Sequence, residues 1–120
     1  MPTRARNNVV HLELHSPDLA EAGGFYAELF GWQRERVHTP SGSYLAVGLG
    51  DALGGGFVES ATPRSLWLPY VEVGDVRTET KRAEQLGASV LLGVREGPAG
   101  WRSVVGTRSG GEIALWQSKR

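Results

Sequence analysis

A strand, a capped helix and a glycine stop follow one another at residues 11–32, which read HLELHSPDLAEAGGFYAELFGW. Asp18 stands where a helix N-cap is expected, and Gly31 supplies the left-handed residue that commonly ends a helix. The same order returns later in the chain, with Asp75 as the cap and Gly87 as the stop. Because the two caps and the two stops are almost equally spaced, the pattern indicates an internal repeat.

The first strand has two chemically different faces, because successive side chains of a strand point to opposite sides. Its apolar face carries Val10, Leu12 and Leu14. Its polar face carries His11, Glu13 and His15. The following helix has an apolar stripe, so we expect it to pack on the apolar face and to leave the polar face open.

In each half of the chain one strand pattern precedes the helix and three follow it, so the chain divides into two βαβββ modules. They are expected at residues 33–37, 43–49 and 53–58 in the first module, and at residues 66–73, 89–95, 101–106 and 112–117 in the second. Module one then spans about residues 8–59, a linker about 60–65, and module two about 66–118. A chain of 120 residues has the size of one domain, so we predict a single α+β domain over residues 1–120.

Composition excludes several classes of partner. Thirteen basic and thirteen acidic residues cancel, which gives no broad electrostatic basis for binding nucleic acid or an anionic membrane. The absence of cysteine excludes disulfides, thiolate metal ligands and thiol nucleophiles. We expect no signal peptide, and the sequence contains no apolar run of the roughly 20 residues needed to cross a bilayer. We therefore expect a cytoplasmic protein that binds neither nucleic acid nor membrane.

Three stretches together resemble the vicinal oxygen chelate superfamily, which contains glyoxalase I, bleomycin-resistance proteins and extradiol dioxygenases. They are residues 11–32, LPYVEVGDV at residues 68–76 and GGEIALWQ at residues 110–117. The resemblance implies that the two modules form one curved mixed sheet, with a concave ligand cup on one face and the helices outside. It also implies a homodimer.

The metal site of this superfamily is only partly present in the sequence. His11 matches the ligand position in the first strand, whereas Leu68 and Ala114 stand where metal enzymes of the superfamily carry His and Glu. The remaining ligand position offers only Glu59. Because catalytic metal sites generally need three protein donors, we predict no metal and no other cofactor. A displaced set stays open as an alternative, made of His11, Glu13 and Glu72 or Glu112.

The concave face expected from strand alternation combines acid/base groups with aromatic walls. Its predicted catalytic residues are His11, Glu13 and Tyr70. Its predicted ligand-binding residues are Tyr44, Glu72, Trp101, Arg102, Glu112 and Trp116, with Trp101 and Arg102 as alternatives in one strand. Burial should raise the pKa of Glu13 toward the range of a general base, His11 could relay the proton, and Tyr70 could donate a hydrogen bond to an oxyanion. These residues favour a cofactor-independent isomerase, lyase or cyclase.

Two other functions stay open. A binding protein of the bleomycin-resistance type would hold a planar, cationic drug between aromatic rings, since an indole face suits stacking and cation–π contact. Of the four tryptophans, Trp101 and Trp116 are the candidate ligand walls, whereas Trp32 and Trp67 are expected in the core. A metal-dependent lyase or dioxygenase with the displaced ligand set is the second alternative.

Overall fold

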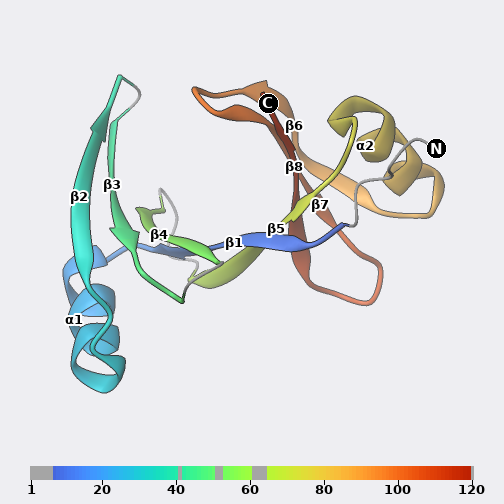
Figure 1. Ribbon diagram of the computed structural model, residues 1–120. Coiled ribbons are helices and arrows are strands. Elements are labelled where there is room, and N and C mark those ends of the chain that lie inside the picture. The colour runs from blue at the N-terminus through green and yellow to red at the C-terminus, as the bar shows by residue number, and fades with distance from the viewer. Residues whose placement is uncertain (1–6, 41, 51–52, 61–64, 120) are drawn as a thin grey trace. The chain divides into compact units, whose positions relative to one another are not determined.

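The computed structural model describes residues 7–40, 42–50, 53–60 and 65–119. In chain order the elements are β1 (Val9–Ser16), α1 (Leu19–Phe30), β2 (Arg34–Thr39), β3 (Gly42–Val47), β4 (Gly54–Glu59), β5 (Leu66–Glu72), α2 (Val76–Gln85), β6 (Ser89–Glu96), β7 (Gly100–Gly106) and β8 (Glu112–Ser118) (Figure 1). Each expected strand and helix is present, with small shifts at the ends. The linker expected at residues 60–65 lies mostly outside the described residues.

All eight strands belong to one open mixed sheet, in the order β2-β3-β4-β1-β5-β8-β7-β6. β1 runs parallel to β4, and β5 runs parallel to β8. The hairpin pairs β2–β3, β3–β4, β6–β7 and β7–β8 are antiparallel. The two halves thus repeat the same strand order, which confirms the predicted α+β fold built from two βαβββ modules.

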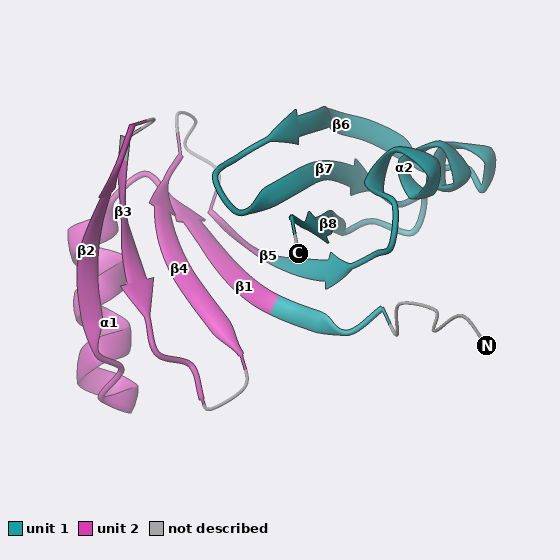
Figure 2. Ribbon diagram, turned by 45° about the horizontal axis from the view of Figure 1, so that its top comes forward, with its two compact units in different colours: residues 1–10, 69–120 teal, residues 11–68 magenta. Residues whose placement is uncertain are grey.

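The chain divides into two compact units, coloured separately in Figure 2. One unit is His11–Leu68, which contains α1 and the hairpin strands of the first half. The other comprises Met1–Val10 and Pro69–Arg120, with α2 and the hairpin strands of the second half. The division falls within β1 and within β5.

In the unit His11–Leu68, α1 begins and ends at the residues that the sequence predicts. The Asp18 carboxylate accepts a hydrogen bond from the backbone N–H of Glu21 at 3.0 Å. Gly31 has a φ of 73° and donates its N–H to the carbonyl of Ala27 at 2.8 Å. Both interactions satisfy backbone groups that a helix end leaves without an intrahelical partner. The local cap signals therefore determine the length of α1.

A small apolar core in this unit lies on the α1 side of the sheet. Its buried members are Leu14, Leu45, Val47 and Phe57. Partly buried rings of Tyr26, Trp32 and Trp67 pack against it. The two tryptophans expected in the core do contact it, but both are only half-buried, so part of each ring faces a hollow on this side of the sheet.

Two glycines of this unit hold positions that a larger side chain would crowd. A Cβ at Gly23 would lie 2.6 Å from Nη1 of Arg34, whose side chain lies over the helix. A Cβ at Gly55 would lie 2.5 Å from Cγ and Cδ1 of Leu49. Close approach thus accounts for Gly23 within a helix and Gly55 within a strand. Nothing in the described structure crowds the position of Gly24.

In the other unit, α2 is fixed to the sheet by polar contacts as well as by apolar packing. The Asp75 carboxylate caps the helix by accepting from the backbone N–H groups of Arg77 and Thr78, and the side-chain oxygen of Gln117 accepts from that of Val76 at 2.9 Å. Farther along, the buried hydroxyls of Thr80 and Ser103 are 2.7 Å apart. Such satisfied polar groups can be buried without a large desolvation cost.

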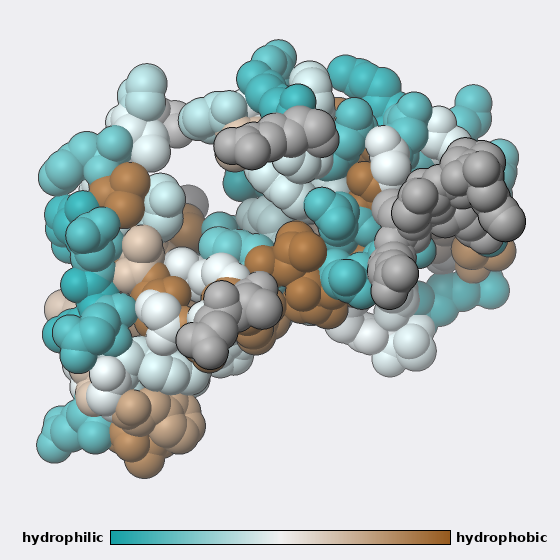
Figure 3. All heavy atoms as spheres, viewed as in Figure 1, coloured by the Kyte–Doolittle hydropathy of each residue, from teal (hydrophilic) through white to brown (hydrophobic). Residues whose placement is uncertain are grey.

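An exposed apolar patch covers part of α1. Phe25, Leu29 and Phe30 are each more than half exposed, and Figure 3 shows apolar atoms gathered over the end of α1. Neither α1 nor α2, the helices of the described residues, is long and apolar enough to cross a membrane.

Candidate functional site

Three polar side chains of β1 meet on the face of the strand that points away from α1. Nε2 of His15 lies 2.8 Å from one carboxylate oxygen of Glu13, and Nε2 of His11 lies 3.5 Å from the other. The Glu13 side chain is only 13% exposed, against 29% for His11 and 30% for His15. A carboxylate is thus held between two imidazoles on one face of a single strand.

This arrangement confirms that His11 and Glu13 share a face, and it adds His15. We name the three residues together the His-Glu-His cluster. The alternation of the first strand predicted that His15 lies on the same face as Glu13. It did not predict a role for His15 in the site. The 2.8 Å contact is a hydrogen bond whose direction is set by the tautomer of the His15 ring. His15 therefore fixes the orientation of the carboxylate that was predicted to be the base.

Neighbouring strands leave space beside the cluster. Gly56 of β4 is the register partner of Glu13 in β1 and of Ala46 in β3. A Cβ at Gly56 would lie 3.7 Å from Cε1 of His11 and 3.6 Å from Cδ2 of Tyr44. His11 and Tyr44 therefore flank a stretch of bare backbone, and the predicted ligand-binding residue Tyr44 shares the face of the His-Glu-His cluster.

Chemically, the cluster suits proton transfer. A general base must reach a substrate proton and keep a fixed orientation, and histidine is the side chain whose protonation changes most readily near neutral pH. Glu13 has two oxygens that face different imidazoles, so either ring could exchange a proton with it. A partly buried carboxylate between two such rings is therefore equipped to accept a proton and to pass it on.

In the unit that contains α2, five of the predicted site residues share one face of the sheet. Strand register pairs Tyr70 with Ala114, Glu72 with Trp116, Arg102 with Trp116 and Gly106 with Glu112, and paired residues lie on the same side of a sheet. The five are Tyr70, Glu72, Arg102, Glu112 and Trp116. This face joins aromatic and charged groups, as the alternation of β5 and β8 predicts.

Tyr70 is the most buried member of this set, at 6% exposed. Its ring centroid lies 6.2 Å from that of Trp116 with the planes tilted by 54°, and Nη1 of Arg102 donates to its hydroxyl oxygen at 3.4 Å. The guanidinium and the indole ring thus hold the phenol in place. Because Tyr70 and Glu13 belong to different units, their predicted cooperation in one reaction stays a prediction.

The sequence offered Trp101 or Arg102 of β7 as a residue of the ligand-binding face. The structure places Arg102 on that face and Trp101 on the opposite one. The register partner of Trp101 is Gln117, whose side chain accepts from the start of α2. Nζ of Lys119 lies 5.5 Å from the centre of the Trp101 indole ring. The prediction that Trp101 shares the Tyr70 and Trp116 face is therefore wrong, because the register turns its ring toward the α2 side.

The residues at the metal positions of the superfamily do not form a metal site. Leu68 and Ala114 are 3% and 0% exposed and carry no donor atoms. Glu59 pairs with Ser16, which lies on the other face of β1 from His11. Within the described ranges, no group of three or more His, Asp or Glu side chains is arranged to hold a metal ion. We derive no catalytic step through a metal.

Known structures share this architecture over nearly the whole chain. Methylmalonyl-CoA epimerase from Mycobacterium tuberculosis aligns with a TM-score of 0.67 and 14% identity, covering 100% of this chain and 93% of the other. A methylmalonyl-CoA epimerase bound to methylmalonyl-CoA and ammonium aligns at 0.69 and 14%, covering 94% and 95%. A glyoxalase/bleomycin resistance protein/dioxygenase superfamily member from Vibrio splendidus 12B01 aligns at 0.66 and 17%, covering 92% and 98%. At these identities the likeness concerns the fold.

The sequence itself supports the same relationship. No curated protein sequence matches the chain at a significant level. The profile of the glyoxalase-like domain, however, matches residues 8–116, which include every strand and both helices apart from the end of β8. The chain therefore belongs to the glyoxalase-like domain family.

Proposed function

We propose that this protein is an enzyme that moves a proton on an oxygenated small molecule, with the Glu13 carboxylate as general base and no metal. The observation that carries the proposal is the His-Glu-His cluster, in which the carboxylate contacts His15 at 2.8 Å and His11 at 3.5 Å. Structural neighbours that are epimerases support a reaction at a carbon beside a carbonyl.

In this reaction the Glu13 carboxylate takes a proton from the carbon next to the carbonyl. The electron pair of the broken C–H bond moves to the carbonyl oxygen and forms an enolate, which a hydrogen-bond donor stabilises. Tyr70, which belongs to the other unit, is the residue that the sequence predicts for this donor role. Returning a proton to the same carbon gives isomerisation, whereas loss of a neighbouring group gives a lyase reaction. His11 relays the proton between Glu13 and solvent, and His15 positions the carboxylate.

Solvent deuterium exchange tests the proposal, because it detects proton transfer at carbon whatever product is formed. The purified protein is incubated in deuterium oxide with a panel of carbonyl compounds and acyl-CoA thioesters, including methylmalonyl-CoA, and deuterium uptake is followed by mass spectrometry. We expect Glu13→Gln to slow exchange by about 10²–10⁴-fold, the usual contribution of a general base. Glu59→Gln is the matched control, since Glu59 is exposed and faces the other side of the sheet. Undiminished exchange in Glu13→Gln would overturn the assignment.

Two further variants and a chelator test the other parts of the mechanism. Tyr70→Phe should lower the exchange rate at saturating substrate, whereas His15→Gln should change the pH profile of the rate because it alters how Glu13 is held. Exchange that persists in a strong chelator supports metal-free chemistry. Loss on chelation that an added divalent metal restores would favour the displaced ligand set of His11, Glu13 and Glu72 or Glu112.

The second candidate function is sequestration of a planar, cationic drug, as in bleomycin-resistance proteins. The pair of rings from Tyr70 and Trp116, with the carboxylates of Glu72 and Glu112 on the same face, favours it. Calorimetric titration with bleomycin should then show binding that Trp116→Leu weakens and Glu13→Gln leaves unchanged. Light scattering on the same preparation tests the expected homodimer.

A further inference from the structure

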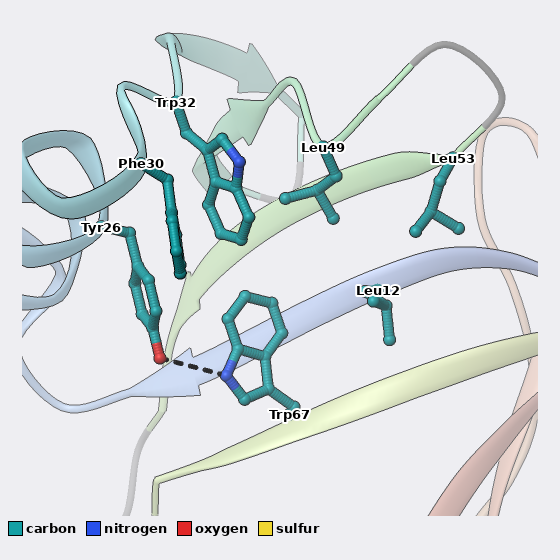
Figure 4. A pocket seen from close by; sticks show the side chains of 7 residues that line it. All are labelled: Leu12, Tyr26, Phe30, Trp32, Leu49, Leu53 and Trp67. Carbon is teal, nitrogen blue, oxygen red and sulfur yellow. Dashed lines mark hydrogen bonds between the residues drawn. The ribbon is translucent and has the colours of Figure 1, made fainter.

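An apolar pocket lies in the unit His11–Leu68, on the α1 side of the sheet. Its volume is about 320 Å³, and its described lining is Leu12, Tyr26, Phe30, Trp32, Leu49, Leu53 and Trp67 (Figure 4). Because Leu12 alternates with His11 and Glu13 along β1, this pocket opens on the opposite face from the His-Glu-His cluster. It is therefore separate from the site proposed for catalysis.

The lining is apolar, and the polar atoms of two of its rings are paired with each other. Nε1 of Trp67 donates to the hydroxyl of Tyr26 at 3.2 Å, drawn as the dashed line in Figure 4. No charged side chain belongs to the described lining. An apolar ligand would cover apolar surface here, whereas a charged ligand would find no charged partner among the described lining residues.

The aromatic walls hold one another in fixed orientations. Phe30 and Trp32 have centroids 4.9 Å apart, Tyr26 and Trp32 are stacked at 5.5 Å, and Trp67 meets the ring of Trp32 edge-on at 6.3 Å with an angle of 87°. Figure 4 shows the four rings gathered at one end of the pocket and the leucines at the other. Because these side chains already pack against one another, a ligand that binds would pay little entropy for ordering them.

The size of the pocket also indicates a ligand. Small-molecule pockets begin at about 300 Å³, and the volume of this hollow reaches that size. An apolar guest in this hollow would remove apolar surface of the lining from water, which favours binding. Trp32 and Trp67 stand nearly at right angles, so a flat ring that stacks on one of them meets the edge of the other.

We infer that this pocket is a binding site for an uncharged, flat, aromatic small molecule of about two fused rings. Leu49 shapes the site, because it covers the bare backbone of Gly55 and closes one side of the pocket. The site is independent of the proton-transfer chemistry proposed above, since it lies on the other face of β1.

Naphthalene is the probe that tests this inference, by nuclear magnetic resonance on the isotope-labelled full chain. We expect saturable shifts of the indole N–H signals of Trp32 and Trp67, assigned with Trp32→Phe and Trp67→Phe, and no shift of those of Trp101 and Trp116. Leu12→Trp should fill the pocket and weaken binding at least tenfold. Leu53→Trp should fill the pocket from another side, and it replaces Leu12→Trp in this test if that variant misfolds.

Two controls separate binding in this pocket from binding elsewhere on the protein. Leu86→Trp adds an indole at a position that is 75% exposed at the end of α2, and it should leave naphthalene affinity unchanged. Glu13→Gln should also leave naphthalene affinity unchanged, although it slows deuterium exchange. The inference is overturned if naphthalene shows no saturable binding, if both filling variants bind it as tightly as the parent protein, or if all four indoles respond alike.

Discussion

Adjacent glycines in β4 allow the two faces of the sheet to be perturbed separately. Gly55 faces the apolar pocket, where an alanine Cβ would lie 2.5 Å from Cγ and Cδ1 of Leu49 and 3.0 Å from the carbonyl oxygen of Val47. Gly56 faces the His-Glu-His cluster, where the nearest atoms to such a Cβ lie at 3.6 Å, an ordinary contact distance. Neither glycine has a positive φ, so alanine is compatible with the backbone at both positions.

The expected change in the free energy of unfolding follows from these contacts. Crowding in a packed core costs about 1–3 kcal/mol. Replacing glycine by alanine at a compatible position stabilises by about 0.4–1 kcal/mol through the unfolded chain. Gly55→Ala should therefore destabilise by up to about 2.6 kcal/mol, the difference between these two effects. Gly56→Ala should be neutral or more stable by up to about 1 kcal/mol, since only the second effect acts there.

Urea unfolding followed by circular dichroism measures both variants under the same conditions. Gly55→Ala should also push Leu49 into the pocket and weaken naphthalene binding, whereas Gly56→Ala should leave that binding intact. Because Gly56→Ala adds a methyl group between His11 and Tyr44, it should instead lower the rate of deuterium exchange. Equal destabilisation by the two substitutions would refute the register of β4 and with it the assignment of the two faces.

Three further predictions concern the helices and the surface. Gly24→Ala should stabilise α1 by about 1 kcal/mol in urea unfolding, and Gly23→Ala should gain less, because its Cβ displaces an arginine side chain. Asp75→Ala should cost about 0.5–2 kcal/mol through loss of the α2 cap, whereas Asp75→Asn should cost little in the same assay. The hydrogen bond and charge of Lys119 lower the pKa of Glu96. Lys119→Met should raise the pKa of Glu96 in a carboxyl titration by nuclear magnetic resonance. In the parent protein, the stabilisation from this ion pair is present at neutral pH and is lost as the pH falls through the lowered pKa. An unchanged Glu96 titration in the variant would contradict the pairing.

Local signals in the sequence determined the elements and their chemical faces. Caps such as Asp18 and stops such as Gly31 act through the backbone of a few neighbouring residues, so they can be recognised before the fold is known. Alternation along β1 likewise placed His11 and Glu13 on one side, because the period of a strand is a local property. The recurrence of this pattern was enough to predict two βαβββ modules.

Tertiary structure decided what depends on pairing between distant segments. The register of β7 against β8 turned Arg102 rather than Trp101 toward Trp116, and a shift of one residue would have reversed that choice. The contact that makes His15 part of the site depends on side-chain conformations, which alternation does not specify. The apolar pocket likewise exists only because α1, β1, β3–β4 and β5 bring Trp32, Leu49 and Trp67 together, so no local pattern could reveal it.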